Sequence, residues 1–157
     1  MNKERKIIPD KIHVLNIKTI KGNIESAPDA DPEQIKGYRF DHSLGTGINE
    51  EESLIGLKLT VDIEALDAKD EPIGISASYT HNFTFNVENL EDFLEKDNNE
   101  DDTPAIDPLM VATLVGIAYS TVRGIIYTRT QSTSLNGVVL PVIDPKKLLE
   151  YDDGKIE

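Results

Sequence analysis

The clearest pattern in the chain is a strict alternation of apolar and polar residues over two consecutive segments. Residues 57–65 place an apolar side chain at every second position, and residues 73–87 do the same. A period of two sends one set of side chains to each face of a strand. The Asp- and Pro-containing run 67–72 lies between them and has the composition of a turn. These segments predict neighbouring antiparallel strands with one apolar face and one solvated face.

Two further strands are predicted before this pair. Residues 12–20 are rich in Ile, Val and Thr, although their alternation is imperfect. A Pro- and Asp-rich loop over residues 26–35 follows. Apolar or aromatic residues then occupy alternate positions over residues 38–44, where Gly45 and Gly47 close the segment. The first half of the chain therefore predicts four strands.

The second half of the chain has helical periodicity. Asp-Pro occurs at 107–108 and again at 144–145, and Asp can cap a helix whose first position is Pro. At 100° per residue, the first helix carries one broad apolar stripe that would cover the apolar face of a sheet. The stripe consists of Val111, Leu114, Val115, Ala118, Tyr119, Val122, Ile125 and Ile126. An extended segment over residues 138–143 leads to a second, short helix.

Four strands followed by two helices predict an α+β fold. We expect a four-stranded antiparallel sheet with one face covered by the long helix, plus a short C-terminal helix. The chain has 157 residues, which is enough for one domain spanning 1–157 with its own core. Residues 1–10 and 152–157 are expected to be flexible, and residues 95–106 to form an acidic loop.

The side of the long helix opposite its apolar stripe carries almost no side-chain bulk. Ala112, Gly116, Ser120 and Gly124 recur there every four residues. Each Gly in a helix costs about 1 kcal/mol relative to Ala, so this ridge calls for a reason. Small residues let two helix backbones approach closely, which predicts a homo-oligomer interface. The alternative is that a local segment of the same chain packs over the ridge.

Composition excludes several classes of function. The formal net charge is −13, so nucleic acid would be repelled and a basic partner attracted. The chain has no Cys, which rules out disulfides and thiolate zinc sites. No apolar segment follows the basic residues 2–6, and the apolar run 109–119 is short for a membrane span. We therefore expect a cytoplasmic protein with no membrane insertion.

No residue pattern predicts an active site. His13, His42 and His81 all fall in predicted strands, without the spacing of a metal site. The acidic run 97–102 ends in Asp102 where a calcium loop would have Gly. The chain also lacks a Gly-x-Ser-x-Gly motif. We predict no catalytic residues, no metal, no cofactor and no enzymatic activity.

The order of elements and several segments together resemble the SecB family of export chaperones. The resemblance covers residues from about Ile12 to Tyr151. It rests on the first strand ending in 26–28, the strand pair around 57–61 and 83–87, and Arg123 in the long helix. The turn 133–137 and the segment 140–144 before the last helix complete it.

This resemblance implies a dimer or a dimer of dimers, with long helices at the interface, that holds unfolded polypeptides in apolar surface grooves. Of the family's Pro-Tyr-Ala-Arg segment, only Arg123 is present here. The family's acidic residues that dock the SecA motor correspond to Gly22, Ser26 and a position near Ser78. Glu25 is one residue out of register with them and is expected on the other face. SecA is therefore a doubtful partner.

We expect an ATP-independent holdase that binds unfolded or precursor polypeptides by burying their apolar segments. The residues expected near the client groove are Tyr38, Phe40, Val139, Leu148, Leu149 and Tyr151. Two alternatives remain open. One is a dedicated binding module for a single protein, such as a toxin–antitoxin chaperone, or for an apolar ligand. The other is a structural subunit of a larger complex.

Overall fold

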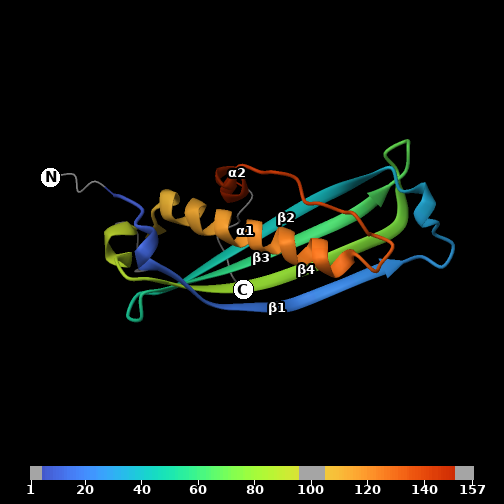
Figure 1. The fold of residues 1–157 in the computed structure, drawn as a ribbon. Helices are drawn as coiled ribbons and strands as arrows, with labels where there is room; N and C mark the ends of the chain where they lie inside the picture. Colours follow the sequence, from blue (N-terminus) through green and yellow to red (C-terminus); the bar gives the residue numbers. More distant parts are fainter. Residues whose placement is uncertain (1–4, 96–104, 151–157) are drawn as a thin grey trace.

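Four long strands form a single antiparallel sheet in the order β1-β4-β3-β2, and a long helix crosses one of its faces (Figure 1). This arrangement comes from a computed structural model, which describes residues 5–95 and 105–150. The predicted α+β fold is confirmed. The main elements are β1 (Ile12–Ser26), β2 (Gly37–Asn49), β3 (Leu54–Leu66), β4 (Pro72–Val87), α1 (Pro108–Thr130) and α2 (Pro145–Glu150).

Short elements connect these parts. Single 3-10 turns precede β1 and β2 and follow β4, at η1 (Pro9–Lys11), η2 (Pro32–Gln34) and η3 (Leu90–Phe93). Two-residue strands β5 (Leu94–Glu95) and β6 (Ala105–Ile106) pair at the ends of the segment predicted to be an acidic loop. The centre of that segment, including residues 97–102, lies outside the described residues, as do residues 151–157.

The strands are longer than the sequence pattern predicts. β1 continues to Ser26 because its pairing with β4 continues to Ile75. β2 continues through Gly45 and Gly47 to Asn49, paired with β3 throughout. The imperfect alternation of β1 also has a cause. The register with β4 shifts at Leu15 and at Ile20, each an extra residue that interrupts a period of two.

The core lies between the alternating faces of β3 and β4 and the apolar stripe of α1. Seven of the eight predicted stripe residues are buried, and Ile125 is partly buried. Phe83 and Phe85 are fully buried on β4, and their rings stack with centroids 6.0 Å apart. The predicted cover of one sheet face by the long helix is therefore confirmed, and the second face of the sheet is open.

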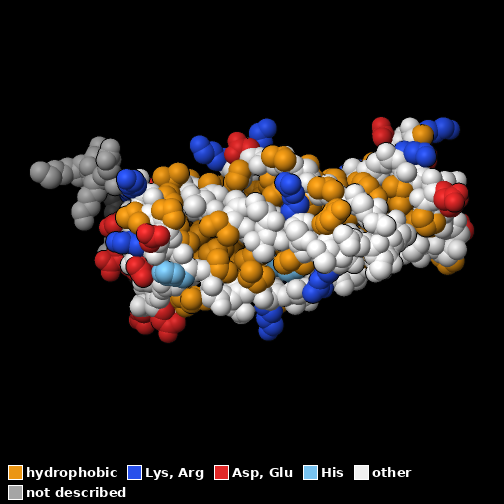
Figure 2. All heavy atoms as spheres, in the orientation of Figure 1, with side chains coloured by type: hydrophobic (Ala, Val, Ile, Leu, Met, Phe, Trp, Pro, Cys, Tyr) orange, Lys and Arg blue, Asp and Glu red, His pale blue; other side chains and the backbone are white. Residues whose placement is uncertain are grey.

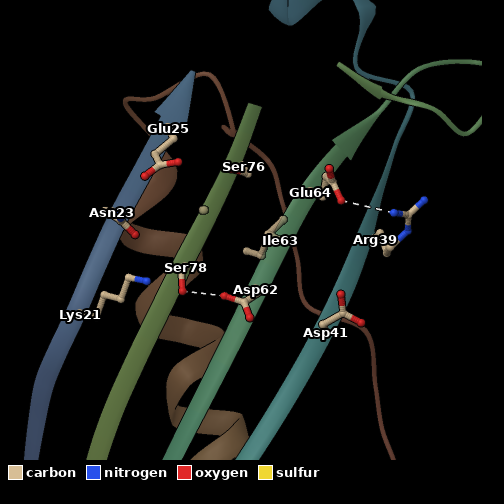
Figure 3. Close-up of a pocket in the computed structure, with 11 residues that line it drawn as sticks. Lys21, Asn23, Glu25, Arg39, Asp41, Asp62, Ile63, Glu64, Ser76 and Ser78 are labelled. Atoms are coloured by element: carbon tan, nitrogen blue, oxygen red, sulfur yellow. Dashed lines mark hydrogen bonds and ion pairs between the residues drawn. The ribbon is translucent and has the colours of Figure 1, made fainter. Parts of the chain in front are cut away.

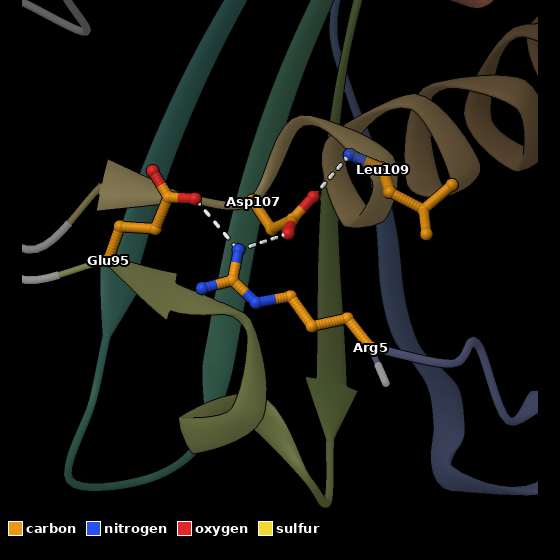
Figure 4. A network of polar contacts seen from close by, with 4 residues as sticks. All are labelled: Arg5, Glu95, Asp107 and Leu109. Atoms are coloured by element: carbon orange, nitrogen blue, oxygen red, sulfur yellow. Dashed lines mark hydrogen bonds and ion pairs between the residues drawn. The ribbon is translucent and has the colours of Figure 1, made fainter. Parts of the chain in front are cut away.

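Asp107 caps α1, as its position before Pro108 predicts. Its carboxylate accepts a hydrogen bond from the backbone amide of Leu109 at 2.8 Å. Arg5 donates to Asp107 and, at 2.7 Å, to Glu95 (Figure 4). Burial works in the opposite direction, but the hydrogen bonds from Arg5 and Leu109 hold the pKa of Asp107 below its usual value. This contact of Arg5 is not anticipated by the sequence, in which residues 1–10 are expected to be flexible.

The length of α1 corrects one expectation. The helix continues well past the run 109–119 and has 23 residues, so by length and composition alone it could cross a membrane. A core helix of a soluble protein meets the same criterion. Here the apolar stripe of α1 packs on β3 and β4, which accounts for its composition without a membrane.

Candidate binding surfaces

An open groove lies between α1 and the segment that returns the chain to α2. Its volume is about 590 Å³, and its walls are Ser120, Arg123, Gly124, Tyr127 and Val139. We call it the helix groove. Tyr127 and Val139 are 43% and 51% exposed, which is high for large apolar side chains. Grooves of this volume are within the usual range for ligand sites.

The predicted small-residue ridge divides into two halves. Ala112 is buried, and a Cβ added at Gly116 would lie 3.6 Å from the Cγ of Pro145 in α2. Ser120 and Gly124 are exposed, and a Cβ added at Gly124 would have no neighbour within 4 Å. A local segment thus covers the first half, and the second half forms the floor of the helix groove. An oligomer interface at this ridge stays a prediction.

A second apolar surface follows β1. Val14 and Ile17 pair with Phe85 and Phe83, so they lie on the same sheet face as the core. The side chains are nevertheless exposed, because β1 lies at the edge of the sheet beyond the cover of α1. In Figure 2, apolar side chains gather along this side of the molecule, below α1. The exposed apolar residues of β1 are Val14, Leu15, Ile17 and Ile20, at 41–58% exposure.

The predicted client-binding residues do not form one site. Val139 lines the helix groove, whereas Tyr38 and Phe40 lie on β2, partly buried, with ring centroids 6.2 Å apart. Leu148 is buried in α2, which packs on both α1 and β2, and Leu149 is partly buried against the core. Tyr151 lies outside the described residues. Only Val139 combines strong exposure with a place in a groove.

Two of the three histidines lie in the core, where sequence reasoning expects ordinary strand residues. His81 on β4 is fully buried, and neither ring nitrogen has a hydrogen-bond partner. Burial, together with the positive charge of Arg129, lowers the pKa of His81. His42 on β2 packs against Tyr119, and burial lowers its pKa as well. Within the described residues, no cluster of His, Asp and Glu could hold a metal ion.

The open face of the sheet is polar. A cavity of about 290 Å³ lies across all four strands, and Figure 3 shows the polar side chains that surround it. Ser78 donates to Asp62 at 2.6 Å, and Arg39 pairs with Glu64 at 3.3 Å. Asp41 and Asp62 are direct cross-strand partners, an arrangement that like charges make unfavourable. The acidic excess of the chain is thus partly placed on this face.

The positions that correspond to the family's SecA-docking residues do not share a face. Gly22 and Ser26 pair with Tyr79 and Ile75, which belong to the helix-covered side. Glu25 pairs with Ser76 on the open side and lines the open-face cavity with Ser78. Glu25 is therefore on the opposite face from Gly22 and Ser26, as its register predicts.

Comparison with solved structures places this arrangement among known folds. A SecB-like chaperone from Mycobacterium tuberculosis, solved in complex with a ChAD peptide from the HigA1 antitoxin, superposes with a TM-score of 0.56. The match covers 85% of this chain and 91% of that chain, at 14% sequence identity. The fold is SecB-like. This confirms the fold that the sequence resemblance implies, while identity this low carries no function with it.

The remaining comparisons add no family. A protein of unknown function from Streptococcus agalactiae aligns over 83% of this chain and 97% of its own, with a TM-score of 0.40 and 12% identity. No family model matches the chain, and no curated protein sequence matches it.

Sequence reasoning missed Arg123 and Tyr127 as groove residues. A signal was present, because the exposed side of an amphipathic helix usually carries several charges, and here Arg123 is the one charged residue between Pro108 and Thr128. It also missed the β1 surface, because Leu15 and Ile20 disturb the alternation that would reveal an apolar face.

Proposed function

We propose that this SecB-like protein is an ATP-independent holdase that binds extended apolar segments of unfolded or precursor polypeptides in the cytoplasm. The observation that carries the proposal is the group of large apolar side chains exposed around α1 and along β1. Contiguous exposed apolar surface is a mark of a binding site in soluble proteins. These residues are Val14, Leu15, Ile17, Ile20, Leu109, Tyr127, Val139 and Val142.

The binding energy in this proposal comes from apolar burial, at roughly 25 cal/mol per Å². No nucleotide, metal or catalytic residue takes part. The mycobacterial SecB-like chaperone, which has the same fold, was solved with a bound peptide, and this supports polypeptide binding here.

The test is suppression of aggregation. A denatured client would be diluted into buffer with the protein at stoichiometric ratio, without nucleotide, and light scattering followed. Val139→Asp should weaken protection, because it places a charge among exposed apolar groups of the helix groove. The matched control is Asn82→Asp, which adds the same charge at an exposed position of β4.

The proposal would be rejected if the protein protected none of several unrelated clients. It would also be rejected if Asn82→Asp reduced protection as much as Val139→Asp did, since the apolar groove would then have no special part.

The second candidate is a dedicated binding module for one protein, such as an antitoxin. The ChAD peptide in the mycobacterial structure favours this candidate specifically. It predicts tight binding of a single partner with poor general protection, so the same assay separates it from a holdase. SecA as a downstream partner finds little support, because Gly22 and Ser26 lie on the opposite sheet face from Ser78.

We also propose that the protein assembles as a homo-oligomer, either a dimer or a dimer of dimers. β1 is an edge strand with one side unpaired, and exposed apolar edge strands usually have a partner. Ser120 and Gly124 leave room for a second helix. Light scattering that shows a strict monomer would reject this assembly.

Substitution of Gly124 tests the ridge more cleanly than substitution of Gly116. Gly116→Leu would disturb Pro145 and the docking of α2, whether or not a second copy binds. Gly124→Leu meets open space within the chain, so a fall in oligomer mass would report contact between copies.

A further inference from the structure

The charges of this chain are distributed unevenly, and the helix groove lies where acidic residues are absent. The chain has 29 acidic residues, yet none falls between Pro108 and Ile143. That stretch contains all of α1 and the segment that forms the other wall of the groove. Figure 2 shows acidic side chains at the two ends of the molecule and beside α2, and none over the middle of α1.

Arg123 is the charged residue among the five that line the groove. Its side chain is exposed, and it forms no ion pair with any described residue. A guanidinium has five donors in a planar fork that matches a carboxylate. An occupant of the groove can therefore supply the acceptor that the chain itself does not.

The surroundings of Arg123 are suited to an extended peptide. Gly124 and Ser120 present little side-chain bulk beside it, so a peptide backbone can approach the helix closely. Tyr127 and Val139 provide apolar contacts on either wall. Behind Arg123, the Tyr119 hydroxyl donates to the carbonyl of Pro141 and is thus already occupied. Burial raises the pKa of Tyr119 to about 12, against the charge of Arg123, so this donor stays protonated at neutral pH.

We propose that the helix groove selects extended apolar segments that carry a carboxylate, which binds the guanidinium of Arg123. The carboxylate can be an Asp or Glu side chain or a free C-terminus. This inference rests on the proposed polypeptide binding and makes it more specific. It also departs from the expectation that a net charge of −13 attracts basic clients, because the local field of the groove is positive.

A basic segment would fit this groove poorly. Its cation would face Arg123, with no acidic residue on either wall to balance the two charges. Like charges at short range disfavour a bound partner, which makes the groove discriminate by repulsion as well as by attraction.

The test uses short apolar peptides with a single Trp. The chain has no Trp, so peptide fluorescence alone reports binding to the full-length protein. Three C-terminally amidated peptides would differ only at the central position, with Asp, Asn or Lys. A fourth peptide would carry central Asn and a free C-terminal carboxylate, which separates the two sources of negative charge.

We expect the Asp peptide to bind about fivefold more tightly than the Asn peptide, with the Lys peptide weakest, as for a partly exposed charge pair. Arg123→Gln should remove this preference, and Arg123→Glu should reverse it in favour of Lys. Arg129→Gln is the matched control, because it removes the same charge from α1 outside the groove, and it should retain the preference. High salt should reduce the preference in the wild type.

A wild type that binds the Asp, Asn and Lys peptides equally would overturn the inference while leaving polypeptide binding intact. Retention of the Asp preference in Arg123→Gln would overturn it as well. Failure of the wild type to bind any of the peptides would instead count against the proposed function itself.

Discussion

β1 and β4 are hydrogen-bonded neighbours along nearly their whole length, yet they differ completely in burial. β4 lies between β1 and β3 beneath α1, and every core-facing residue from Ile75 to Val87 is buried. β1 is exposed at almost every position, although Val14 and Ile17 face the same side as Phe85 and Phe83. Burial is therefore set by what covers a strand and not by the alternation within it. The apolar residues of β1 lack that cover within the described chain.

The largest expected difference concerns two residues that face each other across these strands. Phe83→Ala should reduce the free energy of unfolding by about 3–5 kcal/mol, because it leaves a cavity under α1. Its partner Ile17 is 41% exposed, so Ile17→Ala should cost about 1 kcal/mol or less. Urea unfolding monitored by circular dichroism would measure both values.

These measurements need several protein concentrations, because assembly through β1 would add to the stability that Ile17 contributes. Equal losses for the two variants at low concentration would show that β1 is covered within a single chain. That result would remove the contrast between the strands.

A pair of glycines should give effects that differ in sign or size. Gly74 on β4 has φ +85°, and an added Cβ would lie 2.9 Å from the Cβ of Ala27. Gly74→Ala should therefore destabilise by about 1–2 kcal/mol. At Gly22 on β1 an added Cβ would contact Tyr79 at 3.4 Å without a positive φ, so Gly22→Ala should change stability by at most about 0.5 kcal/mol.

Thermal unfolding of both glycine variants would check this pair. A large loss from Gly22→Ala would mean that the edge strand is packed more tightly over Tyr79 than its exposure indicates. A neutral Gly74→Ala would mean that the turn before β4 can relax.

The smallest expected effect is a dependence of stability on pH that originates in β4. Burial lowers the pKa of His81, so the unfolded chain binds a proton that the folded chain does not. Stability from this source is therefore complete above the unfolded pKa of about 6.5 and is lost as the pH falls below it. The loss should be on the order of 1 kcal/mol between pH 7 and pH 5 for a shift of about one unit.

His81→Leu should reduce this loss, and part of it should remain because the pKa of His42 is lowered too. The control is Thr19→Val on β1, which faces His81 and changes no titrating group. Urea unfolding at pH 7, 6 and 5 would measure the slopes. An unchanged slope in His81→Leu would indicate that its ring is accessible to protons in the folded state.

Much of the fold follows from local periodicity. The alternation of β3 and β4 and the 3.6-residue stripe of α1 identify the core, and Asp107 marks the start of the helix. These signals are local because each depends only on spacing within one element. The placement of Leu15 and Ile20 is not local. Both are extra residues relative to β4, and their effect on register cannot be seen in β1 alone.

The candidate site is less predictable, because it depends on where the chain returns after α1. Gly116 and Gly124 look equivalent in the sequence, but α2 lies beside the first and leaves the second open. Val139 was identified from its apolar character, whereas Leu148 has the same character and is buried. Arg123 becomes meaningful only when the groove and the absence of acidic residues around it are considered together.

The order β1-β4-β3-β2 also has a consequence for the kinetics of folding. The hairpins β2–β3 and β3–β4 join strands that follow one another in the chain, while β1 pairs Ile12 with Val87. Closing short loops loses less chain entropy than closing long ones, and contacts distant in sequence slow folding. The hairpins should therefore nucleate the sheet, with β1 docking last. Substitutions in β1 should accordingly alter the unfolding rate while leaving the rate of folding nearly unchanged.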